Sequence, residues 1–155
     1  MRNQPWTEQY ERMKRYYKRF EQINNGINHS KDSDYYKDEV YSFFTYCYHL
    51  KDWIKNDPGL NIQNVEEFIH SKEILKICGD ISNGVKHLNL NNPKVGNGAK
   101  IEGANFFLNL GSKDQLIKVQ YYIEADGYIY DAFDLATEAI QLWDEFLTEN
   151  NIDSQ

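Results

Sequence analysis

Residues 115–131, QLIKVQYYIEADGYIYD, decide the fold class because they predict two adjacent β-strands joined by a tight turn. Apolar residues take every second position in the first half, an alternation typical of a strand with one buried face. They are Ile117, Val119, Tyr121 and Ile123. Asp126-Gly127 is a favoured hairpin turn. With the strand-like NFFLNL at residues 105–110 and the turn residues GSKD after it, a three-stranded antiparallel β-meander is expected over about residues 104–131.

Apolar residues recur every three or four positions in four other segments, which is the spacing of amphipathic helices. The expected helices cover about residues 5–24, 34–56, 64–90 and 132–148. Residues 1–155 are therefore expected to form a single domain of a mainly α, α+β class. Its architecture is predicted as a four-helix bundle with the small β-meander inserted before the last helix.

The composition is typical of a globular protein. Hydrophobic residues make up 41% of the chain and charged residues 26%, a balance that excludes an intrinsically disordered protein. No apolar run approaches the ~20 residues of a membrane-spanning helix, and the N-terminal residues lack the apolar stretch of a signal peptide. Two cysteines, Cys47 and Cys78, are too few for a disulfide framework or a four-cysteine zinc site. We expect a cytoplasmic protein without membrane contact.

Charge is distributed unevenly along the chain. The net charge is −7, yet all four arginines lie within the first 19 residues, while residues 124–155 hold nine acids and no lysine or arginine. Either the basic and acidic segments neighbour each other in the fold, or the basic segment contacts phosphates. On the second interpretation the RNA-binding residues are Arg12, Arg15, Lys18 and Arg19.

Residues 77–88, ICGDISNGVKHL, place polar residues and two glycines within the expected third helix. The polar residues recur at spacings of four, three and four, and so share one face beside the apolar stripe. They are Lys76, Asp80, Asn83 and His87. A glycine inside a helix costs about 1 kcal/mol relative to alanine. Gly79 and Gly84 therefore indicate either close approach of a partner or substrate, or a kink in the helix.

The expected second helix repeats this polar spacing beside its own apolar stripe. The residues concerned are Thr45, His49, Asp52 and Asn56. If the second and third helices are antiparallel neighbours, His49 and Asp52 face the polar stripe of the third helix. Two histidines and two carboxylates would then converge at one edge of the core.

The residues SNGVKHL at 82–88 resemble the signature of the HEPN superfamily, helical-bundle proteins common in prokaryotic toxin–antitoxin and antiviral defence systems. That signature is an arginine, a polar residue, a few variable residues and a histidine. Asn83 matches the polar position and His87 the histidine, whereas Ser82 stands where the arginine is expected. The segments HLKDW, GDISNGVKHL and DGYIYDAFDLA also resemble, over most of the chain, an uncharacterised group of bacterial proteins.

The HEPN resemblance implies a metal-independent endoribonuclease that works as a homodimer, without a cofactor, on RNA. His87 would be the acid or base and Asn83 would orient the phosphate or the imidazole. Lys86 would stabilise charge on the phosphorane, and Asp80 would hold the histidine tautomer or restrain Lys86. His49 and Asp52 would support them. An arginine of the first helix would replace the missing one, and a cognate antitoxin or defence protein is an implied partner.

Two other interpretations remain open. The chain can be a non-catalytic HEPN-like module that binds a protein or nucleotide partner, because the arginine is missing. Alternatively, the helices can hold a metal ion between His49, Asp52, Asp80 and His87, although the Glu-x-x-His pairs usual for such bundles are lacking.

Overall fold

The computed structural model describes residues 5–28, 31–86, 92–108 and 116–152. This part of the chain forms five helices and four strands. In chain order they are α1 (Pro5–Asn25), β1 (Ile27–Asn28), α2 (Ser33–Asn56), α3 (Val65–His70), α4 (Glu73–Lys86), β2 (Ala99–Leu108), β3 (Leu116–Ala125), β4 (Tyr128–Asp131) and α5 (Ala132–Glu149).

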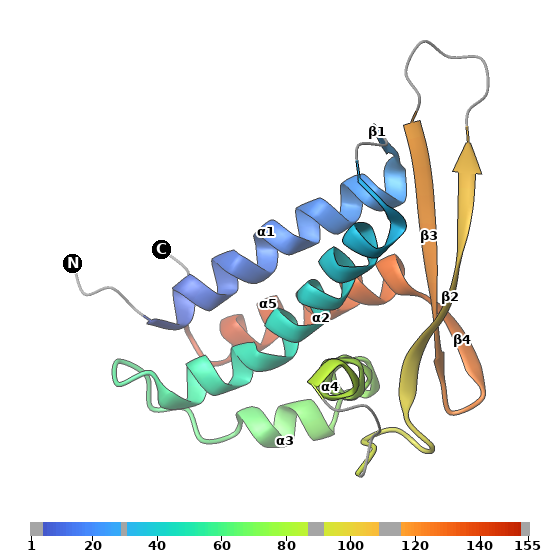
Figure 1. Cartoon of the computed structure of the whole chain (residues 1–155). Coiled ribbons are helices and arrows are strands. Elements are labelled where there is room, and N and C mark those ends of the chain that lie inside the picture. Colours follow the sequence, from blue (N-terminus) through green and yellow to red (C-terminus); the bar gives the residue numbers. More distant parts are fainter. Residues whose placement is uncertain (1–4, 29–30, 87–91, 109–115, 153–155) are drawn as a thin grey trace.

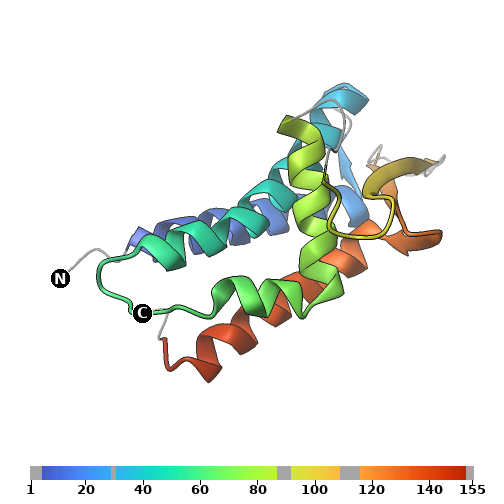
Figure 2. The same cartoon turned by 90° about the horizontal axis from the view of Figure 1, so that it is seen from below.

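The helices pack around a shared core and the sheet lies across one end of them. Figure 1 shows α1 and α2 running side by side towards the sheet with α5 behind them, and α4 between α2 and the lower part of β2; Figure 2 shows α4 crossing between α2 and α5. One face of β3 packs on the helices, so Val119, Tyr121 and Ile123 are buried. The upper ends of β2 and β3 extend past the helices (Figure 1), where Phe106 and Leu108 are exposed.

β3 is the central strand of an antiparallel sheet. β2 pairs with β3 along most of its length, from Ala99 opposite Ala125 to Leu108 opposite Ile117. The other edge of β3 is shared by two short strands. β1 pairs at one end, with Ile27 opposite Ile117, and β4 at the other, with Tyr130 opposite Ile123.

The prediction of a four-helix bundle with a three-stranded meander is wrong, because the described residues form a mixed α+β fold of five helices and a four-stranded sheet. The added strand, β1, is two residues long. A pair of residues is too short to show an alternating pattern, so only its pairing with β3 identifies it.

The fifth helix arises because the expected helix over 64–90 is broken. The backbone N–H of Ser71 donates to Glu67 O at 3.0 Å and closes α3, and α4 begins at Glu73. Figure 2 shows α4 turning sharply away from α3. In one straight helix of 3.6 residues per turn, Ile69 and Leu75 would lie about 120° apart around the axis. Both are buried, and the break lets each face the core.

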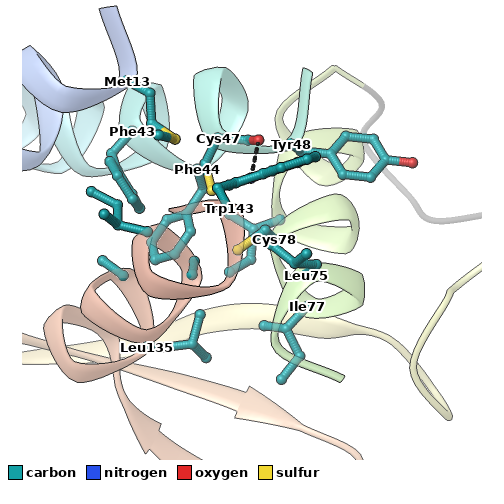
Figure 3. Close-up of a cluster of buried hydrophobic side chains, with 14 of the residues drawn as sticks. Met13, Phe43, Phe44, Cys47, Tyr48, Leu75, Ile77, Cys78, Leu135 and Trp143 are labelled. Atoms are coloured by element: carbon teal, nitrogen blue, oxygen red, sulfur yellow. Dashed lines mark hydrogen bonds between the residues drawn. The ribbon is translucent and has the colours of Figure 1, made fainter. Parts of the chain in front are cut away.

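The core lies where α1, α2, α4 and α5 meet. Figure 3 shows side chains from all four helices gathered around Trp143 of α5. The Trp143 indole is fully buried and donates from Nε1 to the backbone oxygen of Cys47 in α2, at 3.0 Å. Its one polar group is therefore satisfied inside the core. Cys47 and Cys78 are both fully buried and lie next to each other.

The two glycines of α4 have opposite surroundings, which gives a matched pair of variants. A Cβ at Gly79 would lie 2.8 Å from Cε2 of Tyr48, whereas a Cβ at Gly84 would have no atom within 4 Å. We expect Gly84→Ala to raise the free energy of unfolding by up to about 1 kcal/mol, because alanine favours a helix. Gly79→Ala should lower it by about 1–3 kcal/mol through overpacking.

Urea denaturation of both variants measures the difference. Equal and stabilising effects at the two positions would contradict the close packing of α4 on α2.

The buried thiols generate a second prediction. Burial, together with the neighbouring Cys47 thiol, raises the pKa of Cys78 well above its ordinary value. Because the thiolate is the reacting form, Cys78 should react with a maleimide far more slowly in the native protein than in denaturant. Mass spectrometry of timed samples at mildly alkaline pH measures this rate. Rapid labelling of the native chain would show that the core around Cys78 opens.

Candidate functional site

His49 is held at both ring nitrogens by side chains from two helices. Its Nδ1 lies 3.1 Å from Asp52 Oδ2, within α2, and its Nε2 lies 3.3 Å from the Ser82 hydroxyl of α4. The bond to Asp52 follows from the three-residue spacing that places both side chains on one side of a helix. The bond to Ser82 requires α4 to pack against α2. The result is a hydrogen-bonded chain Asp52–His49–Ser82.

The hydrogen-bonded series Asp52–His49–Ser82 is suited to proton transfer by His49. In the neutral ring, Nδ1–H donates a hydrogen bond to the carboxylate of Asp52, and Nε2 accepts one from the hydroxyl of Ser82. When the ring is protonated, both nitrogens donate, Nδ1 to Asp52 and Nε2 to the Ser82 oxygen. The ring therefore keeps its orientation in both protonation states. The order of the groups is that of Ser-His-Asp hydrolases, in which the serine is an exposed nucleophile, whereas Ser82 is buried.

Exposure separates the roles of these three residues. The side chains of His49 and Asp52 are 41% and 45% exposed, whereas Ser82 is 3% exposed. A substrate in solution can therefore reach the imidazole and not the serine oxygen. Ser82 orients His49. Both ring nitrogens are occupied in this arrangement, so proton transfer to a substrate requires Nε2 to exchange its bond with Ser82 for one with the substrate.

Asp80 does not lie beside His49, contrary to the converging arrangement expected from the helical spacing. It is fully buried and its two carboxylate oxygens accept from the backbone N–H groups of Lys94 and Val95, at 2.7 and 3.1 Å. These bonds fasten the segment before β2 to α4. Asp80 is thus a structural clamp in the described part of the chain.

Two lysines flank the site through the ring of Tyr48, whose centre lies 5.4 Å from that of His49. Lys51 Nζ is 5.0 Å and Lys94 Nζ 5.6 Å from the Tyr48 ring centre. Lys51 also pairs with Glu66 at 2.8 Å. Burial lowers the pKa of Lys51, but the bond to Glu66 and nearby negative groups outweigh it, and the net shift is upward. Lys94 makes no ion pair with any described residue.

The predicted RNA-binding residues lie on α1, in two environments. Arg12 pairs with Glu8 at 2.9 Å and Arg19 pairs with Glu39 at 3.2 Å. Arg15 and Lys18 are exposed and make no ion pair within the described ranges. α1 does pack against the acidic α5, but through Tyr10, whose hydroxyl donates to Asp144 Oδ1 at 2.7 Å, and not through the arginines. The basic and acidic segments are neighbours without neutralising each other.

The seam between α1 and α2 carries aromatic rings that the sequence analysis missed. Tyr46 and Trp53 of α2 are half-buried and lie against Arg12 of α1. The spacing of residues 46, 49 and 53 could have found them, because it places both rings on the same side of α2 as His49. The role of Ser82 was also missed. It depends on contact between two helices, which no local pattern reveals.

Other predicted site residues are placed as follows. Asn83 is half-buried, one residue beyond Ser82. Lys76 pairs with Glu73 at 2.9 Å. His87 and the side chain of Lys86 lie outside the described residues. Within the described part, no three histidine, cysteine, aspartate or glutamate side chains gather as metal ligands, and no helix is long and apolar enough to cross a membrane.

Comparison of the chain with protein-family models, with curated proteins and with solved structures gives no match.

The two aspartates provide a direct test of this division of roles. Asp80→Asn should lower the free energy of unfolding by about 1–3 kcal/mol, because one amide group cannot accept from both buried N–H groups. Asp52→Asn should change stability by less than about 1 kcal/mol, since a half-exposed pair contributes little. Chemical denaturation of the two variants measures this. A stability loss at Asp52 as large as at Asp80 would contradict the assignment.

Proposed function

We propose that the chain is a HEPN-like, metal-independent endoribonuclease that uses histidine as acid and base. The observation that carries the proposal is the half-exposed His49 ring, oriented by Asp52 and by buried Ser82. The exposed cations of α1 support an anionic substrate. Asn83 and His87 keep the roles that the HEPN resemblance implies.

The reaction is an internal transesterification of RNA. The ribose 2′-oxygen attacks the adjacent phosphorus as its proton passes to a base, and the bond from phosphorus to the 5′-oxygen breaks as an acid protonates that oxygen. The products are a 2′,3′-cyclic phosphate and a free 5′-hydroxyl. An imidazole can serve either proton step. In this proposal His49 is one of the two groups and acts through Nε2 once the bond to Ser82 is exchanged for one to the substrate, and His87 is the other group.

The charge that develops on the phosphorane needs a cation, which contributes strongly in phosphoryl chemistry. Ser82 occupies the position of the motif arginine and supplies none. The proposal therefore assigns this role to a lysine: Lys86, as implied by the resemblance, or Lys94, whose ammonium has no ion-pair partner in the described part of the chain and lies over the ring next to His49.

A second candidate is a non-catalytic module that binds RNA or another partner. The inward orientation of Ser82 favours it. The residue at the arginine position is 3% exposed and bonded to His49, so it cannot contact a phosphate. In this case Asp52, His49 and Ser82 form a structural link between α2 and α4.

Cleavage of a single-stranded RNA oligomer in the presence of EDTA separates the two candidates. We expect the wild type to cleave, and His49→Gln and His87→Ala each to lower the rate by about 10²-fold or more, as loss of an acid or base does. His70→Gln is the matched control, because His70 is an exposed histidine at the end of α3. It should leave the rate unchanged.

The chemistry of the product ends is the second readout, and a 2′,3′-cyclic phosphate is expected. Binding of RNA without cleavage by the wild type would establish the second candidate. A wild-type rate in His49→Gln, at unchanged thermal stability, would remove His49 from the mechanism.

A further inference from the structure

We propose that the seam between α1 and α2 is a binding track for the unpaired bases of single-stranded RNA. The inference rests on the proposed function in taking RNA as the ligand. It concerns how that RNA is bound, and it is tested separately from cleavage.

The seam holds a row of three aromatic rings and two arginines in contact with one another. Arg12 Cζ lies 5.7 Å from the ring centre of Trp53 and 5.6 Å from that of Tyr46. The Tyr46 ring is 4.8 Å from the ring of Tyr16, and Arg19 Cζ lies 4.5 Å from the centre of the Tyr16 ring. The order along the seam is therefore Trp53, Arg12, Tyr46, Tyr16, Arg19.

This row lies at the rim of the core, where its rings are partly buried and its arginines reach the surface. The side chain of Arg12 is 27% exposed and that of Arg19 is 50% exposed. Trp53 is half-buried, whereas Trp6 and Trp143 are fully buried. Planar rings and guanidinium groups at a surface are the groups on which nucleic-acid bases stack. The exposed part of Trp53 is thus placed to contact a base.

The charge beside the row is complementary to a phosphate backbone. Arg15 lies between Arg12 and Arg19 on the helix surface, at spacings of three and four residues, and Lys18 follows it. Both are exposed and free of ion pairs in the described ranges. α1 contains five lysines and arginines against three glutamates, although the whole chain has a net charge of −7. The positive charge is therefore concentrated where the rings are.

The row is continuous with the candidate catalytic site. Tyr46, His49 and Trp53 follow one another along α2 at spacings of three and four residues. His49 therefore lies between the two rings along the helix axis, with its own ring bonded to Ser82 of α4 and the other two rings against Arg12 of α1. A strand whose bases stack on Tyr46 and Trp53 runs its sugar-phosphate backbone past His49. Because a duplex hides the faces of its bases, this arrangement selects single strands.

Tryptophan fluorescence tests the track directly, because Trp53 is partly buried while Trp6 and Trp143 are fully buried. The experiment uses the full chain carrying His49→Gln, titrated with a 12-nucleotide single-stranded RNA and with the same RNA as a duplex. We expect the single strand to quench the emission and to bind more tightly than the duplex. Trp53→Phe should abolish the quench and largely keep the affinity, measured with a labelled oligomer. Trp53→Ala should weaken it about fivefold or more, as loss of one stacked base does.

Two further sets of variants act as controls. Tyr128→Ala removes an exposed aromatic ring on β4, away from the seam, and should leave binding unchanged. Arg15→Gln and Lys18→Gln should each lower the slope of log K against log salt by about 0.7, the value for one phosphate contact on a single strand. Lys100→Gln, on the sheet, should not.

Each outcome decides the proposal. Equal binding of duplex and single strand, or single-strand binding without a change at Trp53, would overturn the track. Equal binding of single-stranded DNA would overturn the assignment to RNA. Quenching by an acidic peptide as strong as that by RNA would assign the seam to a protein partner instead. Binding with the expected quench but no cleavage by the wild type would support the binding track and contradict the nuclease activity. Cleavage without a change in Trp53 fluorescence would support the nuclease activity and contradict the track.

Discussion

The close approach of α4 to α2 is the constraint on which the rest of the structure depends. It requires the absence of a side chain at Gly79, since a Cβ there would meet the ring of Tyr48 at 2.8 Å. This approach brings Ser82 to His49 and packs Cys78 beside Cys47 under the indole of Trp143. A helix normally disfavours glycine. In α4 that cost is offset by packing that no larger residue permits.

Two buried polar residues of α4, Asp80 and Ser82, have different kinds of partner. Asp80 points inward and secures the segment that leads to β2, whereas Ser82 orients a histidine that solvent reaches. Both are buried side chains with satisfied hydrogen bonds, as buried polar groups need to be. The difference lies in the partner. Asp80 binds backbone N–H groups, which fixes a loop, and Ser82 binds the His49 ring, which fixes its orientation.

The face formed by α1 and α2 differs from the rest of the molecule in charge and in chemistry. An acidic protein repels nucleic acid in general, so any contact with RNA has to be local. The exposed Arg15 and Lys18, together with the arginines of the seam, supply positive charge in one place. The rings of Tyr46 and Trp53 add a stacking surface next to His49. Binding and proton transfer would then share one side of α2.

The sequence by itself determined the elements whose signals are local. The apolar spacing of residues such as Met13, Cys47 and Trp143 located α1, α2 and α5 to within one residue at each end, and the alternation of residues 117–123 located β3, because periodicity records which side of an element is buried. Only the tertiary structure decided what depends on residues far apart in the chain. The break after α3 lets two residues that would lie on different sides of one helix both be buried. β1 is defined by its pairing with β3. Asp80, expected as a catalytic group, instead accepts from the backbone N–H groups of Lys94 and Val95. The link from Ser82 to His49 spans 33 residues. Such contacts depend on how the helices pack against one another. A periodic pattern predicts which side of each helix is buried, but it does not predict which residue of another helix that side contacts.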